Sequence, residues 1–420
     1  MCTKDKIILI SLIGKGKIKE KGYEKADYFF EETGDVISTS FFGSALYRTL
    51  KKQNYEIDQW LIFGTKQSNW SELLSAIEDS TSDKCYHDYL LELCERVYEE
   101  EKAGISDELL KRWEKALRHD IPGIRLLPVD PLDYKVYINA MLNEIVDEKR
   151  KVVLDITHAF RHMPVIIAFS LIVLKYIKNI SDVTVYYGAL DMKNFINGSH
   201  NNCVPVLKID FVTKLVSFAE SLATFNNSAY FVDLLKLLDI HDTEETYFWL
   251  EMNRQPRSQL TQIIHRLSAI SDENSYRSPI ANYLNQQLQP LIGATLDKRM
   301  IERAKFFFDK KQYLKALILL YEGLIIGIGR KHKFSDYLQY DARERIREFI
   351  KNNVQLVFAT EHQKEIYYKL EYTRNAAVHG TPPRGTQDTL EQLDSFEQLF
   401  TQGVKLYEDI VNCEGERYGC

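Results

Sequence analysis

One stretch of the sequence, KVVLDITHAFRHMP at residues 151–164, establishes the class of the fold. It begins with a short, mostly apolar run, which is typical of a β-strand that is buried on both faces. A polar turn follows, and Pro164 then suits the first turn of a helix, because the N–H that proline lacks has no partner there. A strand, a turn and a helix in this order predict part of a parallel α/β sheet.

The same alternation of strand and helix signals runs through the first half of the chain. The first strand is the apolar run 6–13, which ends at Gly14-Lys15-Gly16. The other predicted strands are 26–30, 36–40, 57–63, 124–129, 183–189 and 205–212. Helices are predicted over 43–52, 132–147 and 164–177, with two more within 70–117. Continuous apolar strands separated by helices predict a Rossmann-like, mostly parallel sheet.

Strand signals stop after residue 215, and the remaining apolar residues recur at helical spacing. The predicted helices are 218–238, 259–270, 297–309, 313–328, 342–353 and 361–379. The fold class is therefore α/β plus all-α. We expect an α/β domain over 1–213, with a helical insertion at about 70–118, and a helical domain over 214–420.

Composition limits the function classes. Hydrophobic residues make up 45% of the 420 residues and charged residues 27%, as in ordinary soluble proteins. A net charge of −6 argues against a broadly basic surface that binds nucleic acid, and no helix-turn-helix is found, so DNA is not an expected partner.

The longest apolar stretch, 165–174, is too short to span a bilayer, and the N-terminus does not have the pattern of a signal peptide. The six cysteines (Cys2, Cys85, Cys94, Cys203, Cys413 and Cys420) lack metal-ligand spacing, so a cytoplasmic protein with reduced thiols and no metal is expected.

Glycines, hydroxyls and cations follow the ends of several predicted strands. In an open parallel sheet, ligands bind beyond the carboxyl ends of the strands, and the free amides of a helix N-terminus suit phosphate. The residues at these ends are Ser11, Gly14, Lys15, Gly64, Thr65, Thr157, His158, Arg161, His162, Tyr187 and Gly188. They predict a pocket for a phosphate-bearing ligand, although neither the G-x-G-x-x-G fingerprint nor a P-loop is present. The alternative is that Asp155, His158 and Arg161 only cap the helix.

A second group of polar residues lies in EYTRNAAVHG at 371–380. Gly380 and the following Thr381-Pro382-Pro383 predict the end of a helix, with His379 in its last turn. A histidine can transfer a proton near neutral pH, an arginine can neutralise a phosphate, and an asparagine can orient either. Arg374, Asn375 and His379 are therefore candidates for metal-free RNA cleavage, with a second copy of the helix supplying opposing groups. The alternative is that His379 is an ordinary capping residue.

Together these motifs resemble the CARF–HEPN ribonucleases of type III CRISPR systems. The run 155–164 is similar to the family signature Asp-x-Thr-His-Gly-x-Arg-x-x-Pro, with Ala159 in place of the glycine. Gly14, the segment Thr39–Phe42, and Gly64-Thr65 fit the same domain, which adds Thr39 to the expected ligand-binding residues. Arg374-Asn375-x-x-x-His379 fits the HEPN catalytic pattern, and the helix with Tyr321 and Glu322 resembles its partner helix. Because alanine strongly prefers negative φ, Ala159 predicts a slightly different turn.

The resemblance implies a homodimeric sensor and effector. Its CARF-like domain would bind a cyclic oligoadenylate, with cyclic tetra-adenylate favoured over cyclic hexa-adenylate on family grounds. Its HEPN-like domain would then cut single-stranded RNA by 2′-hydroxyl attack, which leaves 2′,3′-cyclic phosphate ends. No cofactor is implied beyond this activator. Two alternatives stay open: a ring nuclease that degrades its activator, and a non-catalytic sensor that signals to a partner.

Overall fold

The computed structural model describes residues 6–19, 22–77, 84–146, 148–195, 200–337, 339–380 and 385–412. Three of the cysteines (Cys2, Cys413 and Cys420) and the predicted helix stop Thr381-Pro382-Pro383 lie outside these ranges. The chain divides into two compact units, Met1–Val216 and Ser217–Cys420. The predicted fold class is confirmed, because the first unit contains a mostly parallel sheet with helices and the described part of the second is helical.

The first unit is built on an eight-stranded sheet in the order β5-β4-β10-β9-β8-β1-β6-β7. Five neighbouring strands, from β9 to β7, are parallel, whereas β10 is antiparallel to β9, and β5 is antiparallel to β4. The strands are β1 (Lys6–Ile13), β4 (Ala26–Phe30), β5 (Asp35–Thr39), β6 (Glu56–Gly64), β7 (Ile124–Pro128), β8 (Arg150–Asp155), β9 (Ile180–Gly188) and β10 (Val204–Lys208). A small separate sheet pairs β2 (Ile18–Lys19) antiparallel with β3 (Gly22–Tyr23).

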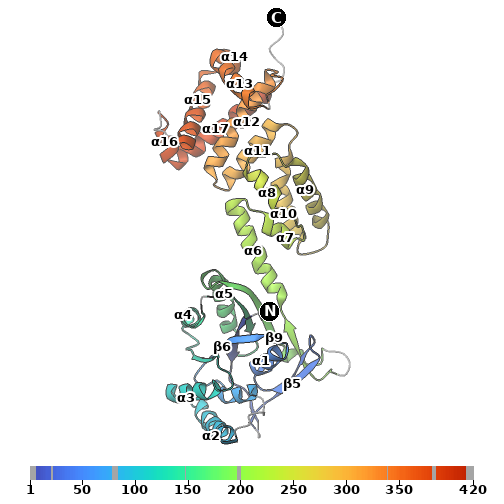
Figure 1. Cartoon of the computed structure of the whole chain (residues 1–420), viewed down its shortest axis with the longest axis vertical. Coiled ribbons are helices and arrows are strands. Elements are labelled where there is room, and N and C mark those ends of the chain that lie inside the picture. The colour runs from blue at the N-terminus through green and yellow to red at the C-terminus, as the bar shows by residue number, and fades with distance from the viewer. Residues whose placement is uncertain are drawn as a thin grey trace. The chain divides into compact units, whose positions relative to one another are not determined.

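Side chains of the central strands alternate between two apolar cores, as the strand period of two requires. Ile7 and Leu9 of β1 face one core, and Ile8 and Ile10 face the other. The first core is covered by α1 (Phe42–Lys52), η1 (Trp70–Ala76), α2 (Lys84–Glu101) and α3 (Asp107–Leu117). The second core is covered by α4 (Tyr134–Glu144) and α5 (His162–Ile177). Figure 1 shows α2 and α3 on one side of the sheet and α4 and α5 on the other.

The predicted last strand, 205–212, is wrong at its C-terminal end. Val206, Leu207 and Lys208 pair with β9, after which the chain enters α6 (Asp210–Ser228). The apolar Phe211 and Val212 extend the strand-like run in sequence, but they lie in the first turn of α6. Asp210 is suited to this start, since an acidic side chain in the first turn complements the helix macrodipole. A short helical turn, η2 (Leu190–Met192), precedes β10.

The second unit packs its described helices around one extensive apolar core. Besides the end of α6, it contains α7 (Val232–Leu237), α8 (Glu244–Glu251), α9 (Arg257–Ser271), α10 (Ser278–Leu288), η3 (Gln289–Ile292), α11 (Leu296–Asp309), α12 (Tyr313–Lys331), α13 (Tyr340–Asn352), α14 (Val354–Val357), α15 (Glu361–His379), α16 (Gln387–Glu391) and α17 (Leu393–Asn412). Gly403 lets α17 approach its neighbours closely, because a Cβ there would lie 2.8 Å from Leu370 of α15 and 2.9 Å from Leu320 of α12. The positions of α12, α13 and α15 matter most for the second candidate site.

Candidate functional site

The loops after β1, β6 and β8 meet at the carboxyl edge of the sheet. Ser68 Oγ donates to the Ile13 carbonyl (2.8 Å), and the Asn69 N–H donates to the Gly14 carbonyl (3.0 Å). Gly14 also lies against the turn after β8, since a Cβ on Gly14 would be only 2.8 Å from the Ala159 nitrogen. A glycine at position 14 therefore allows the two loops to touch.

The turn after β8 is held by side-chain hydrogen bonds. The Thr157 N–H donates to Asp155 Oδ1 (2.8 Å), and Thr157 Oγ1 accepts from the Gly188 N–H at the end of β9 (2.8 Å). Ala159 lies in the left-handed region, with φ of 77°. The chain thus adopts with alanine a conformation that glycine takes up more readily.

Two titratable groups of this turn, Asp155 and His158, have pKa values that are shifted in opposite directions. The His158 imidazole accepts from the Phe42 N–H at the start of α1 (3.0 Å), and burial lowers the pKa of His158 to about 4. The Asp155 carboxyl is fully buried, and this burial raises the pKa of Asp155 to about 7. At neutral pH His158 is therefore uncharged and acts as a helix cap.

The loops enclose a cavity of about 660 Å³. Among the predicted ligand-binding residues, those that line it are Gly14, Lys15, Thr65, Thr157 and His158. The sequence prediction missed the lining residues Lys17, Lys25, Lys193, Gln67, Asn69, Tyr28 and Phe41. Four exposed lysines (Lys15, Lys17, Lys25 and Lys193) and two carboxylates (Glu24 and Asp191) thus border the cavity, and the net positive charge suits an anionic ligand.

The other predicted ligand-binding residues do not line this cavity: Ser11, Thr39, Gly64, Arg161, His162, Tyr187 and Gly188. Ser11 is fully buried and accepts from Trp60 Nε1 (3.1 Å), because its place in the strand alternation turns it into the core. Thr39 is also buried and donates to the Phe41 carbonyl (3.3 Å). Arg161 is exposed, and His162 Nε2 lies 2.8 Å from the Pro131 carbonyl oxygen.

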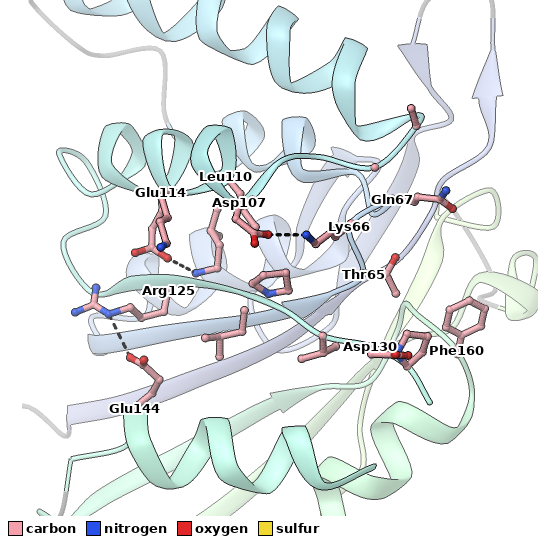
Figure 2. Close-up of a pocket in the computed structure, with 18 of the residues that line it drawn as sticks. Thr65, Lys66, Gln67, Asp107, Leu110, Glu114, Arg125, Asp130, Glu144 and Phe160 are labelled. Atoms are coloured by element: carbon pink, nitrogen blue, oxygen red, sulfur yellow. Dashed lines mark hydrogen bonds and ion pairs between the residues drawn. The ribbon is translucent and has the colours of Figure 1, made fainter. Parts of the chain in front are cut away.

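A larger hollow of about 1050 Å³ lies beside the edge strand β7, against α3 and α4. Figure 2 shows that its charged side chains face one another. Lys66 pairs with Asp107 (2.8 Å), Arg125 pairs with Glu144 (3.3 Å), and Glu114 accepts from the Leu126 N–H (2.7 Å). Since these cations already have carboxylate partners, the smaller cavity is the better site for a phosphate-bearing ligand.

In the second unit, Arg374 of α15 lies between its neighbour Asn375 and Glu322 of α12. Arg374 donates to Asn375 Oδ1 (2.8 Å) and to Glu322 Oε1 (3.3 Å). Glu322 also accepts from Arg343 (3.0 Å) and Arg347 (3.0 Å) of α13, two residues that the sequence prediction missed. The Glu322 side chain is only 8% exposed, so three guanidinium groups surround one nearly buried carboxylate.

His379 is the last residue of α15 and is exposed. Gly380 follows with φ of 62°, so the predicted end of this helix is confirmed. Within the described ranges, no hydrogen bond or ion pair joins the imidazole to Arg374 or Asn375. One copy of the chain thus presents a fixed Arg374–Asn375 pair and a separate, accessible histidine.

In the part of the chain that the structure describes, no group of three or more His, Cys, Asp or Glu side chains is arranged to hold a metal ion. No described helix has both the length and the apolar character needed to cross a membrane.

Comparison with known proteins gives two findings. Residues 8–191 match the family model described as the CARF domain of the CRISPR system endoribonuclease Csx1. The chain is also 24% identical over 407 residues to a CRISPR-associated protein of Methanocaldococcus jannaschii, an alignment that covers 89% of this chain and 62% of the relative. The matched region contains the turn at 155–161 and all residues that line the cavity except Lys193 and Val204. The chain is therefore a CARF-containing protein related to CRISPR-associated proteins.

We predict that Ala159→Gly stabilises the protein by roughly 0.5–1 kcal/mol, because glycine removes the left-handed strain and keeps the turn. Ala168→Gly is the matched control, since Ala168 lies within α5 and glycine there should destabilise by about 1 kcal/mol. Urea unfolding of the three proteins measures both effects. Destabilisation by Ala159→Gly would show that the turn has no strain to relieve.

We predict that the stability of the wild type relative to Asp155→Asn falls as the pH rises from about 4 to about 7. Burial raises the pKa of Asp155 to about 7 in the folded protein, so between about pH 4 and about pH 7 folding takes up a proton. Because protons become scarcer as the pH rises, the folded state loses this stabilisation across the same range. The full linkage value, roughly 4 kcal/mol, is an upper bound. Urea unfolding at several pH values measures the difference, and a difference independent of pH would contradict the assignment.

Proposed function

We propose that this CARF-containing protein is a metal-independent endoribonuclease of type III CRISPR defence, switched on by a cyclic oligoadenylate. The observation that carries the proposal is the CARF match over 8–191, on a chain whose helical unit also holds Arg374, Asn375 and His379 on one helix. The proposed substrate is single-stranded RNA, because the attacking 2′-hydroxyl must swing into line with the leaving oxygen, and A-form stacking opposes this. The proposed setting is the cytoplasm, with neither DNA nor a membrane as partner.

In the proposed reaction, the 2′-oxygen forms a bond to phosphorus as the bond from phosphorus to the 5′-oxygen breaks. The 2′-hydroxyl loses a proton and the 5′-oxygen gains one, which leaves a 2′,3′-cyclic phosphate and a 5′-hydroxyl. His379 is the proposed proton-transfer group, and its exposure leaves it free to meet RNA. Arg374 is proposed to stabilise the charge on the phosphorane, with Asn375 orienting it through their 2.8 Å hydrogen bond.

The cavity of about 660 Å³ is the proposed binding site of the activator. Its rim of lysines supplies positive charge for phosphates. Cyclic tetra-adenylate is proposed over cyclic hexa-adenylate. Binding activates the helical unit only to the extent that the ring binds the active state more tightly than the inactive one.

A homodimer is part of the proposal, since a cyclic activator with near two-fold symmetry suits two copies of one site. The outer face of α5 supports it, because Val165, Phe169, Val173 and Tyr176 recur there at helical spacing and are 47–69% exposed. An apolar stripe of this kind is typical of a contact surface. The second copy would also bring a second His379, as a composite active site requires.

The ring-nuclease alternative has less support from the geometry. His158 Nε2 already accepts a hydrogen bond from the Phe42 N–H, and the pKa of His158 lies near 4 because of burial. Such an imidazole is a poor proton-transfer group at neutral pH. The non-catalytic sensor is kept as an outcome of the experiment.

We predict that the wild type cleaves a fluorescent single-stranded RNA in the presence of EDTA only when a cyclic oligoadenylate is added. His379→Ala should lower kcat by at least about 100-fold, the usual contribution of a proton-transfer group. The assay compares linear, four-membered and six-membered oligoadenylates and identifies the 2′,3′-cyclic phosphate ends of the products.

His362→Ala is the matched control, because His362 is an exposed histidine in the first turn of the same helix. It should cleave like the wild type. No cleavage with either ring would refute the ribonuclease proposal and favour the non-catalytic sensor. Equal loss in both variants would refute the role of His379.

A further inference from the structure

The cluster around Glu322 has more hydrogen-bond donors than its carboxylate can use. Each guanidinium has five N–H donors, whereas a carboxylate has two oxygens with about four acceptor positions. Arg343, Arg347 and Arg374 each give Glu322 one hydrogen bond. The Nε atoms of all three arginines are buried and have no partner among the described residues. Donors therefore remain in this cluster after Glu322 is satisfied.

The charges of the cluster do not cancel either. Glu322 neutralises one of the three cations, and the exposed Glu344 of α13 forms a second ion pair, with Arg347. Three cations thus face two ion-paired carboxylates, while a further carboxylate, Glu371, accepts from the Tyr321 hydroxyl (3.0 Å). The three arginine side chains are 17–23% exposed, so the surplus positive charge is open to solvent. A half-buried surplus of guanidinium charge is suited to bind a phosphate.

The arginines are also held in place before any ligand binds. The guanidinium carbons of Arg347 and Arg374 lie 5.7 and 5.4 Å from the centroid of the Tyr321 ring. Such cation–π contacts, together with the bonds to Glu322, fix the planes of the guanidinium groups. Arg343 and Arg347 are four residues apart on α13 and so share one face of that helix.

We infer that Arg343 and Arg347 bind backbone phosphates of the single-stranded RNA next to the scissile one, and that Glu322 is a positioning residue for Arg374. Glu322 orients the Arg374 guanidinium, while Arg343 and Arg347 compensate its negative charge, so Arg374 keeps its positive charge for the reacting phosphate. This inference rests on the proposed RNA substrate. It adds two phosphate contacts to the residues that the HEPN-like pattern names.

The test measures binding of a fluorescent 2′-O-methyl RNA, which cannot be cleaved because its 2′-oxygen is blocked, to the full-length protein with the activating ring. Arg343→Gln and Arg347→Gln should each weaken binding about ten-fold, the usual effect of losing a charge-assisted hydrogen bond. Each should also lower the slope of log affinity against log salt by about 0.7, the value for one phosphate contact on a single strand. In the cleavage assay, both should raise KM more than they lower kcat.

Arg345→Gln is the matched control, because Arg345 lies on the same helix but pairs with Asp336 and is 56% exposed. It should bind RNA like the wild type. If a glutamine variant does not fold, as its thermal unfolding would show, the comparison uses Arg343→Lys and Arg347→Lys against Arg345→Lys. Lysine keeps the charge but lacks the planar fork, so these variants should keep the salt slope and lose part of the affinity.

Glu322→Gln tests the positioning role separately. It should lower kcat, because Arg374 loses its charged anchor, while RNA affinity stays equal or increases. Wild-type affinity in both the Arg343 and Arg347 variants would overturn the inference even if the wild type cleaves RNA. Absence of any cleavage by the wild type would instead refute the proposed function, whatever RNA affinities are measured.

Discussion

The candidate site of the helical unit depends on one nearly buried carboxylate, Glu322. Taking a carboxylate out of water is costly unless hydrogen bonds and opposite charge replace the solvent. Here the replacement comes from arginines on two other helices, α13 and α15, so the ion cluster connects three segments far apart in the sequence. A cluster of this kind adds little net stability compared with apolar packing, but it permits few arrangements of the helices that form it. The orientation of Arg374 thus follows from the same contacts that set the positions of these helices.

Much of the fold could be predicted from the sequence, because the strands of a parallel sheet leave a strong local signal. The run 6–13 is apolar except for Lys6 and Ser11, and it forms β1 with the predicted bounds. The prediction failed where a strand is followed directly by a helix that also begins with apolar residues. Phe211 and Val212 fit a continuation of the strand by composition, but α6 already begins at Asp210. The last long helix, α17, was not predicted, although its apolar residues at 396, 399, 400, 406, 407 and 410 recur at helical spacing. That signal was present in the sequence and could have been found.

The candidate sites were less predictable, since they depend on contacts between distant segments. The sequence identified Gly14 and the turn after β8, and the structure brings them to within contact distance. It could not show that Ser11 points into the core, because the facing of a strand depends on its register with the neighbouring strands. Nor could it find the lysines at 17, 25 and 193, which reach the cavity from loops with no pattern of their own. Arg343 and Arg347 were missed for a related reason. In the sequence they are indistinguishable from solvent-exposed charged residues of a helix, and only the packing of α13 on α12 places them at Glu322.

The two sites also use different cations, and this difference fits their proposed tasks. Exposed lysines border the cavity of the first unit, and each is a point charge on a flexible stem that can follow a phosphate as a ligand settles. Arginines form the cluster of the second unit, held by a carboxylate and by the Tyr321 ring. Charge stabilisation of a reacting phosphate requires donors that are fixed before the reaction begins, because donors that must still reorient reduce the gain. Since the chain as a whole carries a net charge of −6, the proposed phosphate recognition relies on these local arrangements and not on a general attraction. The distribution of lysine and arginine in this chain therefore favours an adaptable site for the proposed activator and a rigid site for the proposed reaction.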